Sequence, residues 1–284
     1  MQASAWREVR KIDAHVHVVL SEREGTDLRC NPPGAMLGTM EEQNVDRAVV
    51  LPINYPDYFP LEPEERGDWL RANNERQAAI ARASDGRLIG FADCAIDGAY
   101  GHPKRGVEEL TRAVRDLGLA GLKIHASNLK TSVDDPRLLP WIDAACDLDV
   151  PIVFHSNPTG FDPDFHGTAP SRIYRAVFGK DAAYVIAHMG GVSFLEVLAG
   201  GGYVDLSGTL LRIGQFFDPA AVAGMLRSIG IDRLLFATDF PIYPYEAYYP
   251  VLDRLDLSEE EIAQIAYRNA ERMLSGRPPA ANGE

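Results

Sequence analysis

The chain has 284 residues, of which 46% are hydrophobic, so it is long enough and apolar enough to fold as one large domain or two small ones. Its formal net charge of -13 argues against nucleic acid and anionic membranes as partners, because both would repel an acidic protein. No run of about 18 apolar residues occurs, so no membrane-spanning helix is predicted.

The N-terminal segment and the cysteines indicate in which cellular compartment the protein is expected. The first residues, MQASAWREVRKIDAH, lack the apolar core of a signal peptide. Cys30, Cys94 and Cys146 are odd in number and far apart, which fits neither a disulfide framework nor a CxxC metal site. We therefore predict a cytoplasmic protein.

Short apolar segments recur along the chain, and most are followed by a helical pattern. Eight strands are predicted, at residues 11–18, 47–53, 88–94, 119–125, 150–155, 184–189, 203–207 and 233–239. Several are nearly continuous apolar runs, as expected for strands that are covered on both faces.

Capping signals predict helices between these strands, in addition to helical patterns at 64–84 and 104–117. Three N-terminal signals occur: Asp135 before Pro136, Asp218 before Pro219, and Ser258 three residues before Glu261. Gly230 and Gly276 follow the second and third of these helices as C-terminal stops.

Eight strands alternating with helices predict an α/β protein with a single (β/α)₈ TIM barrel over residues 1–276. Residues 277–284 are predicted to form a flexible C-terminal tail. A doubly wound open sheet is the structural alternative, but VLSEREGTD, after the first strand, is not the glycine-rich phosphate turn which that fold normally carries.

The first strand, KIDAHVHV, carries His15 and His17. Because strand side chains alternate between faces, both histidines should point the same way, together with Asp13. We predict that they face the barrel interior. The residues that alternate with them along the strand should then face the helices: Ile12, Ala14, Val16 and Val18. Two imidazoles spaced in this way can reach one metal ion, although hydrogen-bonded core histidines would give the same pattern.

Three further polar residues stand at the C-terminal ends of apolar strands. They are His155 in PIVFHS, His188 in VIAHMGG and Asp239 in LLFATDFP. Barrel active sites form at this end of the strands. A buried aspartate or a group of unpaired histidines would be costly without a cation, so the set predicts a metal site.

In chain order, DAHVH, GLKIH, VFHS, AHMGG and FATDFP resemble the signature segments of the amidohydrolase superfamily. The match is closest to its amidohydrolase-2 branch, which includes the aminocarboxymuconate semialdehyde decarboxylase-like enzymes. The resemblance implies a TIM-barrel enzyme with one divalent metal ion, held by His15, His17, His155 and Asp239. It also implies two catalytic residues: Asp239, which can relay protons, and His188, which acts on the metal-bound water without binding the metal.

Three neutral imidazoles and one carboxylate suit Zn²⁺, with Mn²⁺, Fe²⁺ and Co²⁺ as alternatives. In binuclear relatives a strand-4 lysine is carboxylated and bridges two metals, whereas in this branch Lys123 is expected to stay a plain lysine. Asp13 could accept a hydrogen bond from an imidazole N–H, but a role in strand packing fits as well.

The loops after the strands indicate the kind of substrate. NYPDYFP, which contains Tyr55, and PIYPYEAYY bring aromatic residues and prolines to the expected mouth of the pocket. They suit a compact substrate with a flat or apolar part, although they could simply pack on one another. Lys123, His125, Arg212 and Tyr55 are the predicted substrate-binding residues. Arg212 could hold a carboxylate with two hydrogen bonds, although arginines are common on helix surfaces.

The leading functional prediction is a metal-dependent hydrolase that uses a metal-activated water on a small carboxylated or cyclic molecule. The alternative is a non-oxidative decarboxylase with the same ligands. A TatD-like nuclease is disfavoured because Lys123 stands where those enzymes have a carboxylate, and because the protein is acidic. A binding protein without chemistry is disfavoured because every ligand position is filled. The resemblance further implies a homo-oligomer, a dimer or larger.

Overall fold

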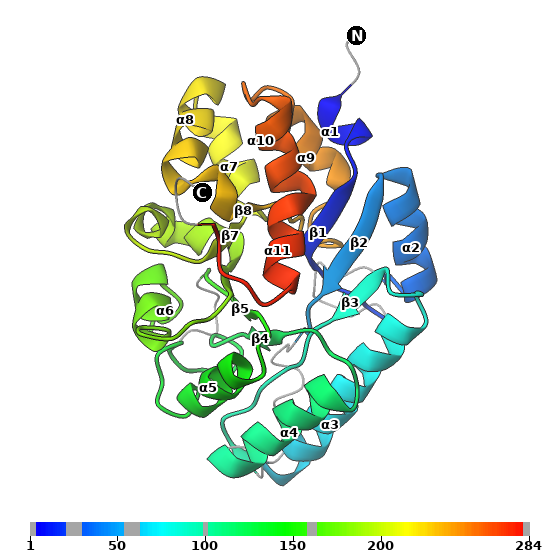
Figure 1. The fold of residues 1–284 in the computed structure, drawn as a ribbon, viewed down its shortest axis with the longest axis vertical. Coiled ribbons are helices and arrows are strands. Elements are labelled where there is room, and N and C mark those ends of the chain that lie inside the picture. Colours follow the sequence, from blue (N-terminus) through cyan, green and yellow to red (C-terminus); the bar gives the residue numbers. More distant parts are fainter. Residues whose placement is uncertain (1–3, 21–29, 54–62, 99–101, 158–163, 281–284) are drawn as a thin grey trace.

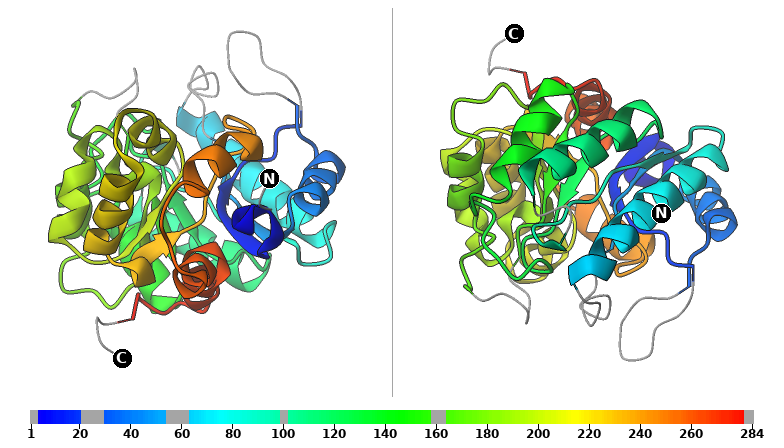
Figure 2. Two further views of the ribbon diagram at one scale, coloured as in Figure 1. Left: turned by 90° about the horizontal axis from the view of Figure 1, so that it is seen from above. Right: turned by 90° about the horizontal axis from the view of Figure 1, so that it is seen from below.

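The computed structural model describes residues 4–20, 30–53, 63–98, 102–157 and 164–280. In this part of the chain, strands occupy the middle of the molecule and helices lie around them (Figures 1 and 2). The strands are β1 (Lys11–Val16), β2 (Val45–Val50), β3 (Leu88–Gly90), β4 (Leu122–Ile124), β5 (Ile152–Phe154), β6 (Tyr184–Ile186), β7 (Tyr203–Asp205) and β8 (Leu234–Leu235). Each coincides with one predicted strand, and β2 alone begins before its predicted start.

The strands close into a barrel. Neighbours pair in parallel within two runs, β1-β2-β3 and β4-β5-β6-β7-β8. Ala92, just after β3, bridges to Leu122 of β4 and joins the two runs. In the segment that follows β8, the Asp239 N–H donates to the His15 carbonyl oxygen of β1 over 2.8 Å. The predicted single (β/α)₈ barrel is therefore confirmed, and the doubly wound alternative is wrong.

The helices surround this barrel, and α3 and α4 match the predicted helices 64–84 and 104–117. They are α1 (Ala5–Glu8), α2 (Pro33–Glu42), α3 (Pro63–Arg82), α4 (Pro103–Arg115), α5 (Leu139–Asp147), α6 (Pro170–Ala176), α7 (Thr209–Phe216), α8 (Pro219–Ile229), α9 (Tyr245–Leu252), α10 (Glu259–Ala263) and α11 (Asn269–Leu274). Shorter helical segments are η3 (Ala187–Ala199), η4 (Ile231–Arg233) and the π-helical turn η5 (Gln264–Arg268).

Two of the three predicted N-terminal capping signals are confirmed, together with one predicted C-terminal stop. The Asp218 carboxylate accepts a hydrogen bond from the Ala220 N–H over 2.8 Å at the start of α8. Gly230 ends that helix with a φ of 108°, which favours glycine. Ser258 and Glu261 form the predicted capping box of α10.

The predicted start of the helix after β4 is wrong, because α5 begins at Leu139 and not at Pro136. The Asp135 carboxylate accepts hydrogen bonds from the Arg137 N–H (2.9 Å) and the Thr131 hydroxyl (2.5 Å). It therefore stabilises a turn that precedes the helix, as a short acidic side chain readily does.

The last predicted helix is divided by the π-helical turn η5. In this turn the Ile265 carbonyl oxygen accepts a hydrogen bond from the Phe236 N–H, just after β8, over 2.9 Å. The turn thus ties the C-terminal helices to the barrel wall.

Apolar side chains fill the barrel interior. One buried cluster joins Ile12 and Ala14 of β1 to residues from β2, β5, β6, β7 and β8, and to Ala270 and Met273 of α11. The Tyr203 hydroxyl, at the start of β7, donates to a backbone carbonyl just after α11 over 2.9 Å. α11 therefore covers the N-terminal ends of the strands, which leaves their C-terminal ends for a site.

None of the helices in the described part of the chain combines the length and apolar character that crossing a bilayer requires. The predicted domain limit at residue 276 and the flexible tail after it stay predictions.

Candidate active site

A cavity of about 220 Å³ lies at the C-terminal ends of the strands. It is lined by His15, His17, Pro52, Ile53, Lys123, His125, Asn128, His155, Asn157, His188, Gly208, Thr209, Arg212, Asp239, Ile242 and Tyr243. The predicted site residues meet here, with the exception of Tyr55, which lies outside the described residues.

A β-bulge in β1 brings His15 into this cavity. The pairing of β1 with β2 slips between Asp13 and Val16, and the extra residue interrupts the alternation of side chains. Ala14 and His15 therefore both face the barrel interior, Ala14 in the apolar cluster and His15 at the cavity. His17, two residues further on, lines the same cavity.

The prediction that Asp13 points inward beside the histidines is wrong, because the bulge separates it from them. Its carboxylate accepts hydrogen bonds from the N–H (3.1 Å) and the hydroxyl (2.5 Å) of Thr238, and it lies beside Tyr245 of α9 on the helix side of β1. Ile12 and Ala14, predicted to face the helices, are instead in the interior cluster. Asp13 therefore joins β1 to the segment after β8 and does not orient an imidazole.

Each of four histidines directs one ring nitrogen at a protein acceptor. The contacts are His15 Nδ1 to Asp205 Oδ2 (2.8 Å), His17 Nδ1 to the Leu51 carbonyl (3.0 Å), His155 Nε2 to the Asn157 carbonyl (2.5 Å) and His188 Nδ1 to Ser207 Oγ (2.8 Å). A carbonyl or carboxylate oxygen can only accept, so the nitrogen that faces it carries the proton. The Ser207 hydroxyl directs its own proton at Asp205 Oδ1, 2.5 Å away, so it accepts from His188 Nδ1. These contacts fix the orientation of each ring.

Burial keeps three of these rings neutral. It lowers the pKa of His155 to about 3, and the pKa values of His15 and His188 well below the usual 6.5. A neutral imidazole has one N–H and one nitrogen lone pair. Because the N–H points at the protein, the lone pair of the second nitrogen points into the cavity.

These second nitrogens meet the Asp239 carboxylate. Asp239 Oδ1 lies 2.9 Å from His17 Nε2 and 3.4 Å from His15 Nε2, and the donor atoms of the three residues all lie within 4.8 Å of one another. Beside them, His155 Nδ1 lies 3.2 Å from His188 Nε2. The structure thus gathers His15, His17 and Asp239 into one compact group, and it pairs His155 with His188 next to that group.

The donor set fits a divalent cation. His155 Nδ1 and His188 Nε2 both present lone pairs, so their contact places two acceptors against each other, and Asp239 Oδ1 is a buried acceptor beside the His15 and His17 rings. Positive charge between such atoms would relieve the repulsion and the cost of burying them. Imidazole nitrogens with a carboxylate oxygen are ligands that Zn²⁺ and neighbouring divalent metals accept.

Both predicted catalytic residues have an uncommon backbone. His188 has a φ of 56° and Asp239 a φ of 61°, in the left-handed region that costs a non-glycine residue of order 1–3 kcal/mol. After His188 the turn continues to Gly191, where a Cβ atom would lie 2.5 Å from Asn157 Oδ1. Only glycine lets the loop after β6 pack this closely on the loop after β5. Strained residues of this kind concentrate at functional sites.

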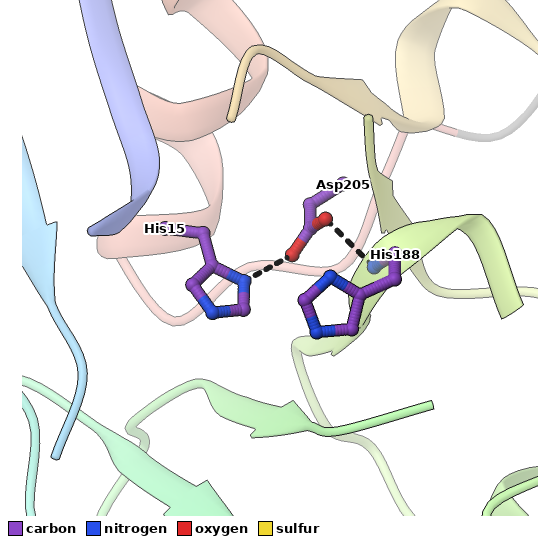
Figure 3. Close-up of side chains that lie close together, drawn as sticks. All are labelled: His15, His188 and Asp205. Carbon is purple, nitrogen blue, oxygen red and sulfur yellow. Dashed lines mark hydrogen bonds and ion pairs between the residues drawn. The ribbon is translucent and has the colours of Figure 1, made fainter. Parts of the chain in front are cut away.

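Asp205, the last residue of β7, is a site residue that sequence reasoning missed. Figure 3 shows its carboxylate between the His15 ring and the backbone of His188. It is fully buried and accepts from His15 Nδ1 and from the His188 N–H, both over 2.8 Å. The available signal was an acidic residue at the C-terminal end of an apolar strand, in YVDLS, which is the signal that identified Asp239.

Lys123 and Arg212 bring positive charge to the cavity walls. Lys123 Nζ is buried and has no hydrogen-bond partner among the described residues. Burial lowers its pKa to about 8, against the opposing effect of Asp205 and Asp239. Arg212, on α7, is exposed at the cavity edge. The His125 ring stacks on His155, with ring centroids 3.7 Å apart.

A family model described as amidohydrolase matches residues 12–276. The chain belongs to the amidohydrolase-2 family. The resemblance of the strand-end segments to this family is thereby confirmed, and the protein is a member of an enzyme family.

Solved structures share the barrel of this family member at low sequence identity. The 2,6-dihydroxybenzoate decarboxylase from Rhizobium has a TM-score of 0.72 and 17% identity, over 93% of this chain and 98% of that one. The 5-carboxyvanillate decarboxylase from Sphingomonas paucimobilis has a TM-score of 0.69 and 15% identity, over 93% and 98%. A dihydroxybenzoic acid decarboxylase from a Polaromonas species, with bound manganese and the inhibitor 2-nitroresorcinol, has a TM-score of 0.71 and 16% identity, over 93% and 96%. No curated protein sequence matches significantly.

Proposed function

We propose that this member of the amidohydrolase-2 family is a metal-dependent, non-oxidative decarboxylase of a small carboxylated organic molecule. The observation that carries the proposal is a compact set of metal-competent atoms, around Asp239 Oδ1, in a cavity that also contains the cationic side chains of Lys123 and Arg212. The sequence favoured a hydrolase and kept decarboxylation as the alternative. The decarboxylases that share the barrel support the alternative more strongly.

One divalent ion would be held by His15, His17, His155 and Asp239, all of which line the cavity. The manganese in the Polaromonas enzyme supports Mn²⁺ as a candidate beside the Zn²⁺ expected from the sequence. When bound, the ion would polarise substrate oxygen atoms and offset their negative charge.

The cavity suits a planar, compact acid. A cavity of about 150 Å³ in another protein holds benzene, and the volume here is about 220 Å³, which leaves room for a few ring substituents. Ile53, Ile242 and Tyr243 offer apolar contact area. Lys123 within the cavity and Arg212 at its edge would attract and orient carboxylate or phenolate oxygens.

Decarboxylation makes two demands on the protein. The bond between the substrate carbon and its carboxylate breaks, the electron pair stays on that carbon, and CO₂ leaves. A proton must then reach the same carbon. Asp239 and His188 both line the cavity, so the Asp239 carboxylate or His188 Nε2 can take up a proton from solvent and deliver it to that carbon as a general acid.

Product analysis of the purified, Mn²⁺- or Zn²⁺-supplemented protein tests this function. A panel of hydroxylated benzoates and other carboxylated aromatics should include at least one compound that releases CO₂ and yields the matching decarboxylated product. A parallel panel of lactones and amides tests hydrolysis, the second candidate, which the donor set would also serve. Acid release from that panel without CO₂ release from the first would replace the proposed function by hydrolysis.

Arg212→Gln should raise KM for the carboxylated substrate by about 10- to 100-fold with little change in kcat. The expected loss is that of a charge-assisted hydrogen bond, about 1.5–3 kcal/mol. Arg227→Gln is the matched control, because Arg227 lies on α8 and pairs with Glu261 at the surface. Steady-state kinetics separate the two parameters, and an unchanged KM would remove Arg212 from substrate binding.

A further inference from the structure

Asp205 is the centre of a hydrogen-bond network that contacts two site histidines. Its Oδ2 faces His15 Nδ1 at 2.8 Å (Figure 3). Its Oδ1 is contacted by the His188 N–H (2.8 Å), the Ser207 N–H (3.1 Å) and the Ser207 hydroxyl (2.5 Å). The Ser207 hydroxyl in turn lies 2.8 Å from His188 Nδ1. All of these residues are buried.

The direction of each hydrogen bond in this network follows from the donors available. Two backbone N–H groups donate to Asp205 Oδ1, so this oxygen is an acceptor. The single hydroxyl proton of Ser207 is directed at the same oxygen over a short distance. The hydroxyl oxygen is then left to accept, and His188 Nδ1 must carry the proton that it receives. His15 Nδ1 donates in the same way to Asp205 Oδ2.

We propose that Asp205 and Ser207 are positioning residues that fix the tautomer and ring orientation of His15 and His188 together. The proposal rests on the proposed function, in which His15 binds the metal and His188 handles a proton. Asp205 holds His15 directly, whereas it holds His188 through Ser207 and through the backbone N–H. One buried carboxylate thus aims the lone pairs of both rings into the cavity.

The position of Asp205 in the barrel explains how one side chain reaches both rings. β7 lies between β6, which precedes His188, and β8, which is followed by the segment that hydrogen-bonds to β1 at His15. The bond to the His188 N–H also anchors a residue with a left-handed φ of 56°. Hydrogen bonds of this kind to metal-binding histidines fix the tautomer, and losing one typically costs about 10- to 100-fold in metal affinity or activity.

The test compares Ser207→Ala and Asp205→Asn with two controls that alter buried polar groups elsewhere. Ser84→Ala removes a buried hydroxyl near β3 whose partners among the described residues are backbone groups, and Glu109→Gln changes a buried carboxylate between α3 and α4. Two-bond ¹H–¹⁵N correlation spectra of metal-free, full-length protein with labelled histidines report the tautomer of each ring. Mn²⁺ titration reports metal affinity, and turnover is measured on the loaded protein.

In the unaltered protein and both controls, His15 and His188 should be protonated at Nδ1 and bare at Nε2. Ser207→Ala should disturb only the His188 tautomer, leave Mn²⁺ affinity near its original value and lower kcat by about 10- to 100-fold. Asp205→Asn should disturb both rings and weaken Mn²⁺ binding by a similar factor. Unchanged tautomers in both folded variants would overturn the proposal.

The proposal assigns His15 to Asp205 alone and His188 to Asp205 and Ser207 together. A Ser207→Ala variant that loses Mn²⁺ affinity as strongly as Asp205→Asn would overturn this assignment. The spectra and the Mn²⁺ titration need no substrate. Absence of CO₂ release from every protein, the unaltered one included, would therefore count against the proposed function. The tautomers and the Mn²⁺ affinities would still test the positioning role of Asp205 and Ser207.

Discussion

His15→Ala should abolish metal binding and reduce turnover to the background rate. His15 Nε2 faces the cavity within the compact group formed with His17 and Asp239, so its removal takes away a central donor. It also leaves the Asp205 Oδ2 atom buried without the ring that donates to it, which costs about 1–3 kcal/mol of folding free energy.

Thermal unfolding with and without Mn²⁺ separates these two effects. At a free metal concentration of 100 times Kd, binding should stabilise the unaltered protein by about 2.7 kcal/mol, or roughly 5–10 °C in Tm. The variant should unfold at a lower temperature and show no Mn²⁺-dependent shift. His102→Ala is the matched control, because His102 is exposed at the start of α4 and should change neither result. A full complement of Mn²⁺ in His15→Ala, measured by elemental analysis, would remove His15 from the ligand set.

Elemental analysis of the unaltered protein counts the metal ions bound to each chain. We expect one per chain, because Lys123 enters the cavity as a buried amine and the compact donor group around Asp239 suits a single ion. Two ions per chain would contradict the mononuclear prediction.

The barrel and the position of its site could be predicted from the sequence because both depend on strand ends. Apolar runs marked the strands, and the polar residues that ended them, such as His155 and Asp239, had to meet at one face once the barrel closed. Chain order and alternation with helices fixed this arrangement without any knowledge of side-chain contacts.

The orientation of Asp13 could not be predicted, because strand periodicity assumes an unbroken ladder. A single extra residue between Asp13 and Val16 reverses the faces of the residues before it, and nothing in KIDAHVHV marks the bulge. The start of α5 was misplaced for a related reason. An Asp–Pro pair can begin a helix or stabilise a turn. Here the hydroxyl of Thr131 donates a hydrogen bond to the Asp135 carboxylate, which stabilises the turn.

Asp205 was missed for a different reason. Its strand-end position was visible, but an aspartate that accepts from histidines and one that binds metal look alike in a sequence. Only the geometry shows that Asp205 faces His15 Nδ1, on the side of the ring away from Asp239.

His188→Asn should keep nearly full metal occupancy while kcat falls by about 10²–10⁴-fold, the usual contribution of a positioned proton-transfer group. Its Nε2 lies 3.2 Å from His155 Nδ1 at the cavity, so it is placed much like a ligand. We nevertheless assign it to proton transfer because of coordination number. His15, His17, His155 and Asp239 already offer four protein donors, and a fifth would leave less room for substrate.

Metal content and kinetics measured on the same His188→Asn preparation decide between these roles. Full Mn²⁺ occupancy with a lowered kcat supports proton transfer, and the pH dependence of kcat should change because one titrating group has been removed. Loss of the metal would make His188 a ligand. An unchanged kcat with retained metal would show that Asp239 alone delivers the proton, and His188 would then serve to hold the left-handed turn after β6 against Asp205 and Ser207. His102→Asn is the control, since the same replacement at an exposed histidine should leave kcat, its pH dependence and metal content as they were.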